Sequence, residues 1–210
     1  MRPAIDRRRL MLGLAGALLA GPALSADEAA IARVVADLRQ GGFVIFFRHG
    51  ETGRSGADRP QAVMGDCTTQ RNLDDVGQAQ VHRLGEDFRA LGIPAGKVLS
   101  SEFCRCWQHA EAMFGKGGYR ITEKLTVARS YPAVTEADRK LNNDNLGAML
   151  AEKPAGVTNT VLISHGNNLL MLTGYHPDIQ GEAVIFRPDG TGGYARIASL
   201  MPRDWTRARR

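Results

Sequence analysis

Apolar and amphipathic segments alternate along the chain from residue 26 onward, and this pattern predicts strands and helices in turn. The predicted strands cover residues 43–47, 97–100, 119–125, 160–164, 184–186 and 194–200. The predicted helices cover 26–40, a segment capped by Asp74 or Asp75 and ended by Gly92, and then 102–114, 135–150 and 167–173. Strands that alternate with helices indicate an α/β fold.

The order of these elements favours a three-layer α/β/α sandwich with a mainly parallel sheet. The last two strands flank the Gly-rich segment 190–193, so we expect them to form a C-terminal antiparallel hairpin. Neither an internal repeat nor a second-domain linker is visible, and residues 26–210 are predicted to form one domain. A chain of 210 residues that is 43% hydrophobic can bury a substantial core.

Residues 1–25 have the pattern of an export signal and are not counted in that domain. Arg7-Arg8-Arg9 precedes an apolar stretch that is short for a membrane span, and Ala23-Leu24-Ser25 is a small-residue cleavage site. The paired arginines resemble a twin-arginine signal, although Asp6 stands where Ser or Thr is usual, so both export routes stay open. An uncleaved amphipathic anchor is the alternative. We expect a periplasmic or secreted protein without stable membrane association after signal removal.

Removing the signal changes the charge of the chain. The full sequence carries 27 basic and 22 acidic residues, a formal net charge of +5, whereas residues 26–210 carry 23 and 21, a net charge of +2. Because no basic stripe interleaved with aromatic residues is present either, nucleic-acid binding is not expected. The basic tail 203–210 is expected to be a solvated end. The oligomeric state stays open.

The sequence contains three cysteines, Cys67, Cys104 and Cys106. An oxidising compartment favours one disulfide and leaves one thiol over. Cys104 and Cys106 are too close in sequence for an easy bridge, so the predicted pair is Cys67 with Cys104. A zinc site is the rival interpretation, but no histidines have matching spacing. We expect no metal and no other cofactor.

One pattern, an apolar strand followed by His-Gly, occurs twice. Arg48-His49-Gly50 follows the run 43–47, and His165-Gly166 follows the run 160–164. Ligands of open α/β sheets bind at the carboxyl ends of the strands. We therefore expect the two imidazoles to meet over one anion, and Gly50 to let a phosphate approach the backbone closely.

If the anion is a phosphate monoester, the basic residues near these strand ends are suited to bind it. Arginine and imidazole groups can bind phosphoryl oxygens without a metal ion. Arg48 precedes the first histidine, Arg105 lies in the first turn of a predicted helix, and Arg71 is a further candidate clamp. Because a neutral imidazole can attack phosphorus, His49 is the predicted nucleophile, and His165 completes the pocket.

These motifs together resemble the histidine phosphatase superfamily, also called phosphoglycerate mutase-like. The resemblance is carried by Arg48-His49-Gly50-Glu51-Thr52, Arg71-Asn72-Leu73, Gly77-Gln78-Ala79, Ser100-Ser101, Arg105, Ala110 and Ser164-His165-Gly166-Asn167. It implies a phosphohistidine at His49, a pocket built from Arg48, Arg105, His49 and His165, and no required metal.

The sequence departs from that family where the leaving group is protonated. The family's acidic donor is expected near residues 126–134, yet 126–132 contains no carboxylate, and no Asp follows His165. A leaving alkoxide needs a proton. The candidate acid is Glu182, for which an exposed turn residue is the alternative interpretation. Three further glutamates are weaker candidates: Glu51, Glu123 and Glu136.

The predicted function is a metal-independent phosphomonoesterase that acts on a small phosphorylated substrate through a phosphohistidine on His49. Two alternatives stay open. One is a non-catalytic module that binds a phosphorylated ligand, and the other is a phosphohistidine-protein phosphatase. A glycolytic mutase is disfavoured because the chain carries an export signal.

Overall fold

The computed structural model describes residues 26–53, 58, 62–126 and 134–210, and the predicted signal segment lies outside them. Within these residues, six strands form one sheet in the order β3-β2-β4-β1-β5-β6. The first four run parallel, whereas β5 and β6 continue the sheet in antiparallel fashion. The strands are β1 (Val44–Arg48), β2 (Ala95–Ser100), β3 (Arg120–Ile121), β4 (Asn159–Ser164), β5 (Ala183–Pro188) and β6 (Tyr194–Leu200). The predicted mainly parallel sheet with a C-terminal hairpin is confirmed.

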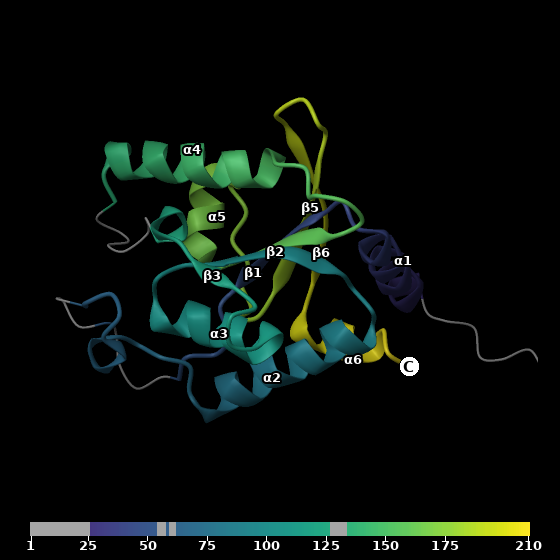
Figure 1. The fold of residues 1–210 in the computed structure, drawn as a ribbon, viewed down its shortest axis with the longest axis horizontal. Coiled ribbons are helices and arrows are strands. Elements are labelled where there is room, and N and C mark those ends of the chain that lie inside the picture. The colour runs from purple at the N-terminus through teal and green to yellow at the C-terminus, as the bar shows by residue number, and fades with distance from the viewer. Residues whose placement is uncertain (1–25, 54–57, 59–61, 127–133) are drawn as a thin grey trace, which may run out of the picture.

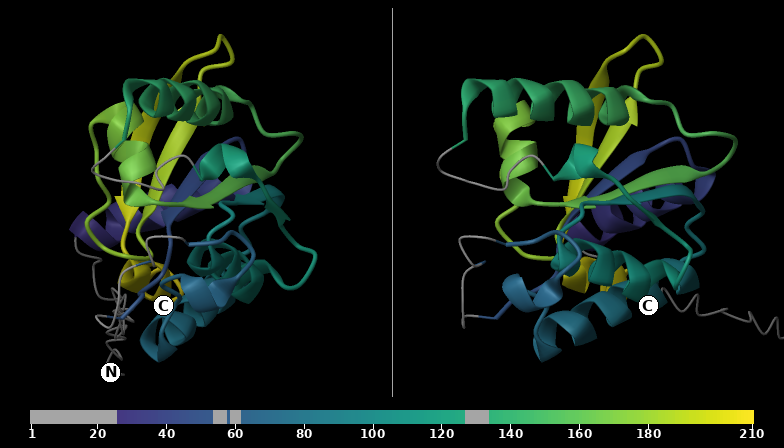
Figure 2. Two further views of the ribbon diagram at one scale, coloured as in Figure 1. Left: turned by 90° about the vertical axis from the view of Figure 1, so that its left-hand side faces the viewer. Right: turned by 60° about the vertical axis from the view of Figure 1, so that its left-hand side comes forward.

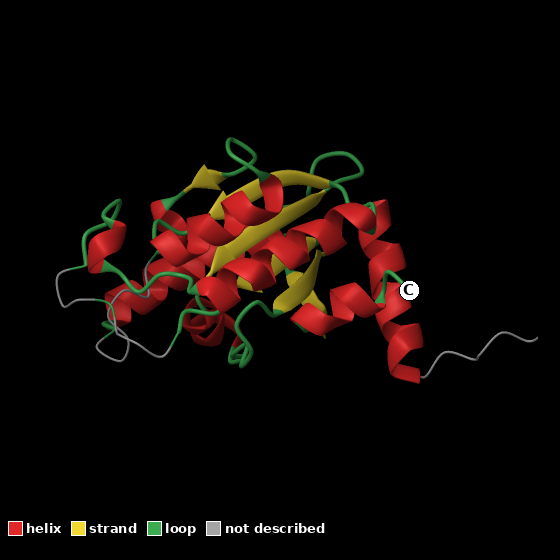
Figure 3. Cartoon of the chain, turned by 90° about the horizontal axis from the view of Figure 1, so that it is seen from below, coloured by secondary structure: helices red, strands yellow, loops and turns green. Residues whose placement is uncertain are grey.

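Helices cover both faces of the sheet and complete three layers (Figure 1). One face carries α4 (Glu136–Ala151) and α5 (Gly166–Thr173). The other face carries α1 (Ala26–Gln40), α2 (Asp75–Ala90), α3 (Cys104–Phe114) and α6 (Pro202–Arg207). Figure 2 shows the sheet between these layers, and Figure 3 looks onto the second one. None of the described helices combines the length and apolar composition needed to cross a membrane.

Strand β1 illustrates how the sequence produces these layers. Ile45 and Phe47 belong to the apolar cluster under α1, α2, α3 and α6, whereas Val44 and Phe46 belong to the cluster under α4 and α5. All four side chains are fully buried. A central strand covered on both faces needs apolar residues at every position. This requirement explains the uninterrupted apolar run that precedes Arg48.

The strand register aligns the carboxyl ends of β1, β2 and β4. Arg48 pairs with Ser164, and Ser100 pairs with Ile163. The pairing continues one residue further, because the His49 N–H donates to the Ser164 carbonyl at 3.0 Å and the Ser101 N–H donates to the Ile163 carbonyl at 3.0 Å. The residues that follow the three strands are therefore brought to one edge of the sheet.

The predicted strand at residues 119–125 is wrong in extent. Strand β3 is limited to Arg120–Ile121, and a 3-10 helix follows at Glu123–Leu125. The hydroxyl of Thr122 accepts a hydrogen bond from the Lys124 N–H and so begins the turn. Leu125 is fully buried in the α4–α5 layer. The chain therefore buries Leu125 from a turn and not from a strand.

The prediction of a solvated C-terminal tail is also wrong. Residues 202–207 form α6, whose Trp205 is fully buried and lies 5.8 Å from Phe47 between ring centroids. The fully buried carboxylate of Asp87 accepts hydrogen bonds from the Thr206 hydroxyl at 2.6 Å and from Arg209 Nη1 at 2.7 Å. The basic composition of the tail gave no sign that Trp205 would be buried or that the distant Asp87 would bind the helix.

Candidate active site

His49 follows β1 directly and is buried, with 3% of its surface exposed. Its Nδ1 atom lies 2.9 Å from the Gly50 carbonyl oxygen. Because a carbonyl oxygen can only accept a hydrogen bond, Nδ1 carries the proton and the lone pair lies on Nε2. This main-chain contact therefore selects the tautomer in which Nε2 can act as a nucleophile.

The surroundings of His49 keep its ring neutral. Burial lowers the pKa of the imidazole well below its ordinary value, and the positive charges of Arg105, Arg48 and Arg71 lower it further. The hydrogen bond to Gly50 acts in the opposite direction and is outweighed. A neutral imidazole has the free electron pair that attack on phosphorus requires.

His165 begins α5 and faces the first imidazole. The ring centroids of His49 and His165 are 5.5 Å apart with planes inclined by 66°. On its other side, His165 Nε2 lies 3.1 Å from the Ser101 hydroxyl and 3.6 Å from the Cys106 sulfur. Burial and the Arg105 charge lower the pKa of His165 well below its ordinary value. The predicted meeting of the two histidines is confirmed.

Arg105 lies in the first turn of α3, and 6% of its side-chain surface is exposed. Its Nη1 donates to the Asp58 carboxylate at 2.8 Å and to the Arg71 carbonyl at 3.2 Å. The guanidinium also lies over the Phe103 ring, 4.3 Å from its centroid. One edge of the side chain is thus held by protein groups, whereas its buried Nε has no hydrogen-bond partner within the part of the chain that the structure describes.

Arg71 supplies a second unsatisfied donor beside the first. Its Nε is also buried without a partner among the described residues, and its pKa is lowered by burial and by the charge of Arg105. Two like charges in a buried setting repel each other, and each unpaired N–H carries a desolvation cost. A bound anion with several oxygens would relieve both penalties, so this arginine pair is suited to a phosphoryl group.

Arg48 lies at the same strand end and is oriented by main-chain groups. Its Nη1 donates to the carbonyl of Pro177 at 2.7 Å and to that of Asp178 at 2.8 Å. Burial lowers its pKa. Since the charges of all three arginines act on His49, the structure brings Arg48, Arg71 and Arg105 together around the histidine pair.

Gly50 and Glu182 have contacts that the sequence did not indicate. A Cβ atom on Gly50 would lie 2.5 Å from Val81 Cγ1, so glycine makes room for α2 at this strand end.

Glu182 is buried, with 1% exposed, and is not the exposed turn residue of the alternative interpretation. Its Oε1 accepts from the Tyr175 hydroxyl at 2.6 Å, while Oε2 is buried without a partner among the described residues.

The backbone of Glu182 adjoins the carboxyl end of β1. Its carbonyl accepts from the Arg48 N–H at 3.0 Å, and the Gly181 N–H donates to the His49 carbonyl at 3.0 Å. The carboxyl group favours the charged form of the Arg48 guanidinium. Glu182 therefore stands on the Arg48 side of the pocket.

Sequence reasoning did not identify four residues that contact the site. Asp58 lies in an aperiodic polar segment without any periodic signal, and Gln70 reaches the helix end through a side-chain contact. Ser101 and Cys106 lie in a recognised motif region, but their contacts with His165 depend on the fold. Part of the loop where the family's acid is expected, residues 127–133, lies outside the described residues.

The predicted disulfide between Cys67 and Cys104 is confirmed, and Cys106 is a buried free thiol. Burial raises the pKa of Cys106 to about 12.

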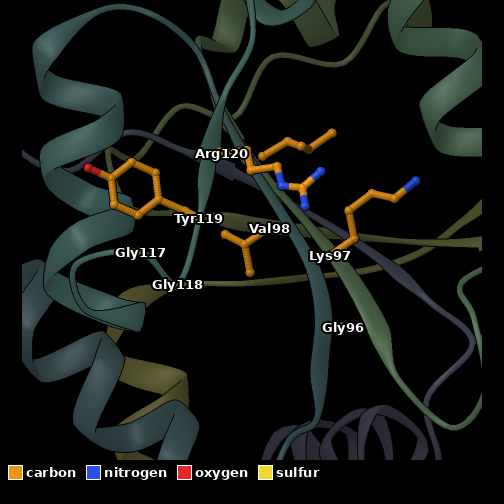
Figure 4. A pocket seen from close by; sticks show the side chains of 8 residues that line it. Gly96, Lys97, Val98, Gly117, Gly118, Tyr119 and Arg120 are labelled. Carbon is orange, nitrogen blue, oxygen red and sulfur yellow. The ribbon is translucent and has the colours of Figure 1, made fainter.

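Across the described residues, His, Cys, Asp and Glu side chains do not gather in groups of three that could hold a metal ion, and the zinc interpretation has no support there. A hollow of about 530 Å³ lies along β2 and β3 and contains none of the histidine-pocket residues. Lys97, Tyr119 and Arg120 help to line it (Figure 4).

His109 belongs to the core and not to the pocket. The residue is fully buried, its Nε2 lies 3.1 Å from the Met113 sulfur, and its ring meets Phe47 edge to face at 5.5 Å. Nδ1 has no partner. Burial lowers the pKa of His109 to about 3.

This buried histidine predicts a loss of stability in acid. In the unfolded chain the imidazole of His109 takes up a proton below about pH 6.5, whereas in the folded protein it stays neutral down to about pH 3. The contribution of His109 to the free energy of unfolding is therefore complete above the unfolded pKa. As the pH drops below that value, the free energy of unfolding falls by up to about 1.4 kcal/mol per pH unit. We expect His109→Leu and His109→Asn each to remove this slope in urea unfolding measured between pH 7 and pH 4.5. A difference from wild type that stays constant with pH contradicts the prediction.

Two imidazoles that their surroundings keep neutral lie at the carboxyl edge of a parallel sheet, and the charges of three arginines act on them. This arrangement is suited to binding an anion such as a phosphoryl group. Residues 44–126 match the family model of the histidine phosphatase superfamily (branch 1). The match makes this part of the chain similar to that superfamily and supports a phosphatase enzyme.

Solved structures share this fold at low sequence identity. The protein histidine phosphatase SixA complexed with tungstate aligns with a TM-score of 0.53 and 18% identity, covering 77% of this chain and 98% of SixA. Phosphoserine phosphatase from Entamoeba histolytica, in complex with 3-phosphoglyceric acid, gives 0.53 and 15%, with 78% and 98% covered. A mycobacterial glucosyl-3-phosphoglycerate phosphatase gives 0.52 and 13%, with 75% and 98% covered. A search of curated protein sequences finds no match.

Proposed function

We propose that the protein is a metal-independent phosphomonoesterase that transfers the phosphoryl group to Nε2 of His49. The observation that carries this proposal is the contact between His49 Nδ1 and the Gly50 carbonyl. It leaves the reactive lone pair on Nε2, inside a pocket where three arginines also keep the ring deprotonated. A nucleophile and a cationic cage are thus present together.

The reaction takes place in two steps. Arg48, Arg105 and His165 bind the non-bridging phosphoryl oxygens and neutralise the charge that spreads over them in the transition state, while Arg71 adds a contact that binds the phosphate of the substrate. The Nε2–P bond of His49 forms while the bond from phosphorus to the leaving oxygen breaks, and an acid protonates that oxygen. A water molecule then attacks phosphorus, gives its proton to the same group, and releases inorganic phosphate and free His49.

The proposed proton donor is Glu182. Its carboxyl group is buried on the Arg48 side of the pocket, and Oε2 is unpartnered. The Tyr175 hydroxyl holds Oε1, which leaves the second oxygen to carry and release the proton.

The role of Glu182 predicts a dependence on the leaving group. Glu182→Gln is expected to lower kcat/KM, which reports the step that forms phosphohistidine, by about 10²-fold to 10⁴-fold for an alkyl phosphate, whose leaving oxygen needs a proton, and by less than about 10-fold for 4-nitrophenyl phosphate. Steady-state kinetics on both substrates measure this difference. Tyr175→Phe keeps the carboxyl group of Glu182 and removes its hydrogen bond, so this variant measures how much of the loss comes from the changed position of Glu182. Equal losses on both substrates in Glu182→Gln rule out the acid role.

Acid-quench trapping tests the whole proposal. The enzyme is mixed with a ³²P-labelled phosphomonoester, quenched, and digested under conditions that preserve phosphohistidine. Acid-labile label on the peptide that contains His49 is the expected result. The absence of label with active enzyme, or label on an oxygen nucleophile, rules the mechanism out. A non-catalytic binding module would give neither label nor turnover.

A second candidate is a phosphohistidine-protein phosphatase, which draws support from the structural likeness to SixA. Comparing kcat/KM on a phosphohistidine-bearing protein with that on small phosphomonoesters separates the two candidates.

We also propose that the protein acts after export, and the disulfide supports this because disulfides persist in oxidising compartments. Cell fractionation of the full chain, with the N-terminus of the product sequenced near residue 26, tests the export.

A further inference from the structure

The Cys67–Cys104 disulfide joins the two segments that carry Arg71 and Arg105, whose Nε atoms have no partner among the described residues. Cys104 is the first residue of α3, and Arg105 is the second. Cys67 begins the 3-10 helix Cys67–Thr69, and Arg71 follows that helix by two residues. The covalent link therefore joins the segment that carries one guanidinium to the helix end that carries the other, with a Cα–Cα distance of 5.7 Å.

Little apolar packing holds the segment that carries Arg71. The 3-10 helix contains no buried residue. Apart from the disulfide, the segment is held to α3 by hydrogen bonds: Gln70 Oε1 accepts from the Cys104 N–H at 2.9 Å, and the Arg71 carbonyl accepts from Arg105 at 3.2 Å. Individual hydrogen bonds of this kind contribute modestly to stability because water competes for both partners.

Electrostatic repulsion acts against this arrangement. Arg105 lowers the pKa of Arg71, which means that each positive charge disfavours the other. Asp58 offsets part of the repulsion, since its carboxylate accepts from Arg105 Nη1 at 2.8 Å and from the Arg71 N–H at 2.9 Å. A covalent link limits how far the segment can move when the anion site is empty.

We propose that the Cys67–Cys104 disulfide is a positioning element of the phosphate clamp, which holds Arg71 beside Arg105 and thereby sets the affinity of the pocket for the phosphoryl group. This inference rests on the proposed function. On this inference, the affinity of the pocket for phosphate depends on whether Cys67 and Cys104 are oxidised, whereas the rate of the chemical step does not.

Thiol reduction of the wild-type enzyme gives the first test. Dithiothreitol supplies two electrons and two protons, so the S–S bond breaks, Cys67 and Cys104 become thiols, and the reductant closes to its cyclic disulfide. The buried Cys106 is already a thiol and is left unchanged. Losing one well-placed charged hydrogen-bond donor is expected to raise KM for 4-nitrophenyl phosphate, and Ki for inorganic phosphate, by about 10-fold or more. The kcat is expected to change by less than about 3-fold, because His49, His165 and Arg105 remain on their own elements.

Two variants separate positioning from general stabilisation. Cys67→Ser/Cys104→Ser is expected to show the raised KM without reductant and no further response to it. Arg71→Ala is expected to show the raised KM while oxidised, and reduction is expected to add nothing, because the group being positioned is gone. A disulfide that merely stabilises the fold would instead lower the active fraction on reduction, leave KM unchanged, and act in Arg71→Ala as in wild type. The active fraction is measured by the amount of trapped phosphoenzyme.

The outcomes also distinguish this inference from the proposed function. Oxidised wild-type enzyme without turnover and without phosphohistidine contradicts the proposed function. Oxidised enzyme that turns over normally, but whose KM is unchanged on reduction or in Arg71→Ala, overturns the positioning role alone. The Arg71→Ala result decides the question even where the double cysteine variant does not fold, since its disulfide is intact.

Discussion

Replacing His49 with alanine is expected to lower kcat for 4-nitrophenyl phosphate by about 10⁴-fold or more and to abolish the acid-labile label. The imidazole supplies the atom that forms the covalent intermediate, and no other group can take its place at the same distance from phosphorus. The arginines and His165 remain, so binding is retained. Ki for inorganic phosphate is therefore expected to stay within about 10-fold of wild type, because the guanidinium contacts contribute most of the charge-assisted binding.

The chain offers a matched control for this substitution. His82 lies on α2 and is exposed to solvent, so His82→Ala should retain wild-type kcat and labelling. Circular dichroism and thermal unfolding of both variants show whether the buried position tolerates the loss of the ring. A His49→Ala enzyme that keeps more than about 1% of kcat, a residual activity well above what loss of the nucleophile allows, with the label found on His165, would assign the attack to the second histidine.

The sequence was sufficient to predict the pair of histidines because the information is local. Each imidazole directly follows a strand whose apolar run is visible in the sequence, and parallel strands bring their carboxyl ends to one edge. Arg48 and Arg105 are located by the same logic, as the last residue of β1 and an early residue of α3.

The partners of these residues could not be predicted, because they come from segments without periodicity. Arg48 is oriented by the main-chain carbonyls of residues 177 and 178, and Arg105 by a carboxylate in a polar loop. Main-chain acceptors leave no trace in the sequence, since any residue type provides them. The direction of the Glu182 side chain likewise depends on Tyr175, which becomes a neighbour only when β5 is paired.

Errors in the predicted elements have the same origin. A window over residues 119–125 shows apolar positions but not that Thr122 turns the chain after two residues of strand. The C-terminal tail reads as basic and polar, and the partner that docks it, Asp87, lies on α2 more than a hundred residues away. Composition describes a segment on its own, whereas docking depends on the surface that it meets.

Replacing Arg105 with alanine is expected to lower kcat/KM by about 10³-fold and to shift the pH dependence of the reaction. The first effect follows from losing a buried donor without a partner among the described residues, which we propose binds the transferring oxygens. The second follows because Arg105 is the largest charge that lowers the pKa values of His49 and His165. Without it both pKa values rise, the nucleophile takes up a proton at higher pH, and the acid limb of the kcat/KM profile moves upward in pH.

Arg105→Lys separates these two effects. Lysine keeps the positive charge but lacks the planar fork, in which Nη1 donates to Asp58 while the other N–H groups stay available for a phosphoryl group. We expect this variant to keep the acid limb near its wild-type position while losing about 10²-fold or more in kcat/KM, because a single ammonium group cannot reproduce the geometry of these donors. If Arg105→Ala and Arg105→Lys instead move the acid limb equally, charge is not what keeps His49 neutral. Burial alone would then account for the state of the nucleophile, and the arginine would act on the phosphoryl oxygens and not on the ring that attacks them.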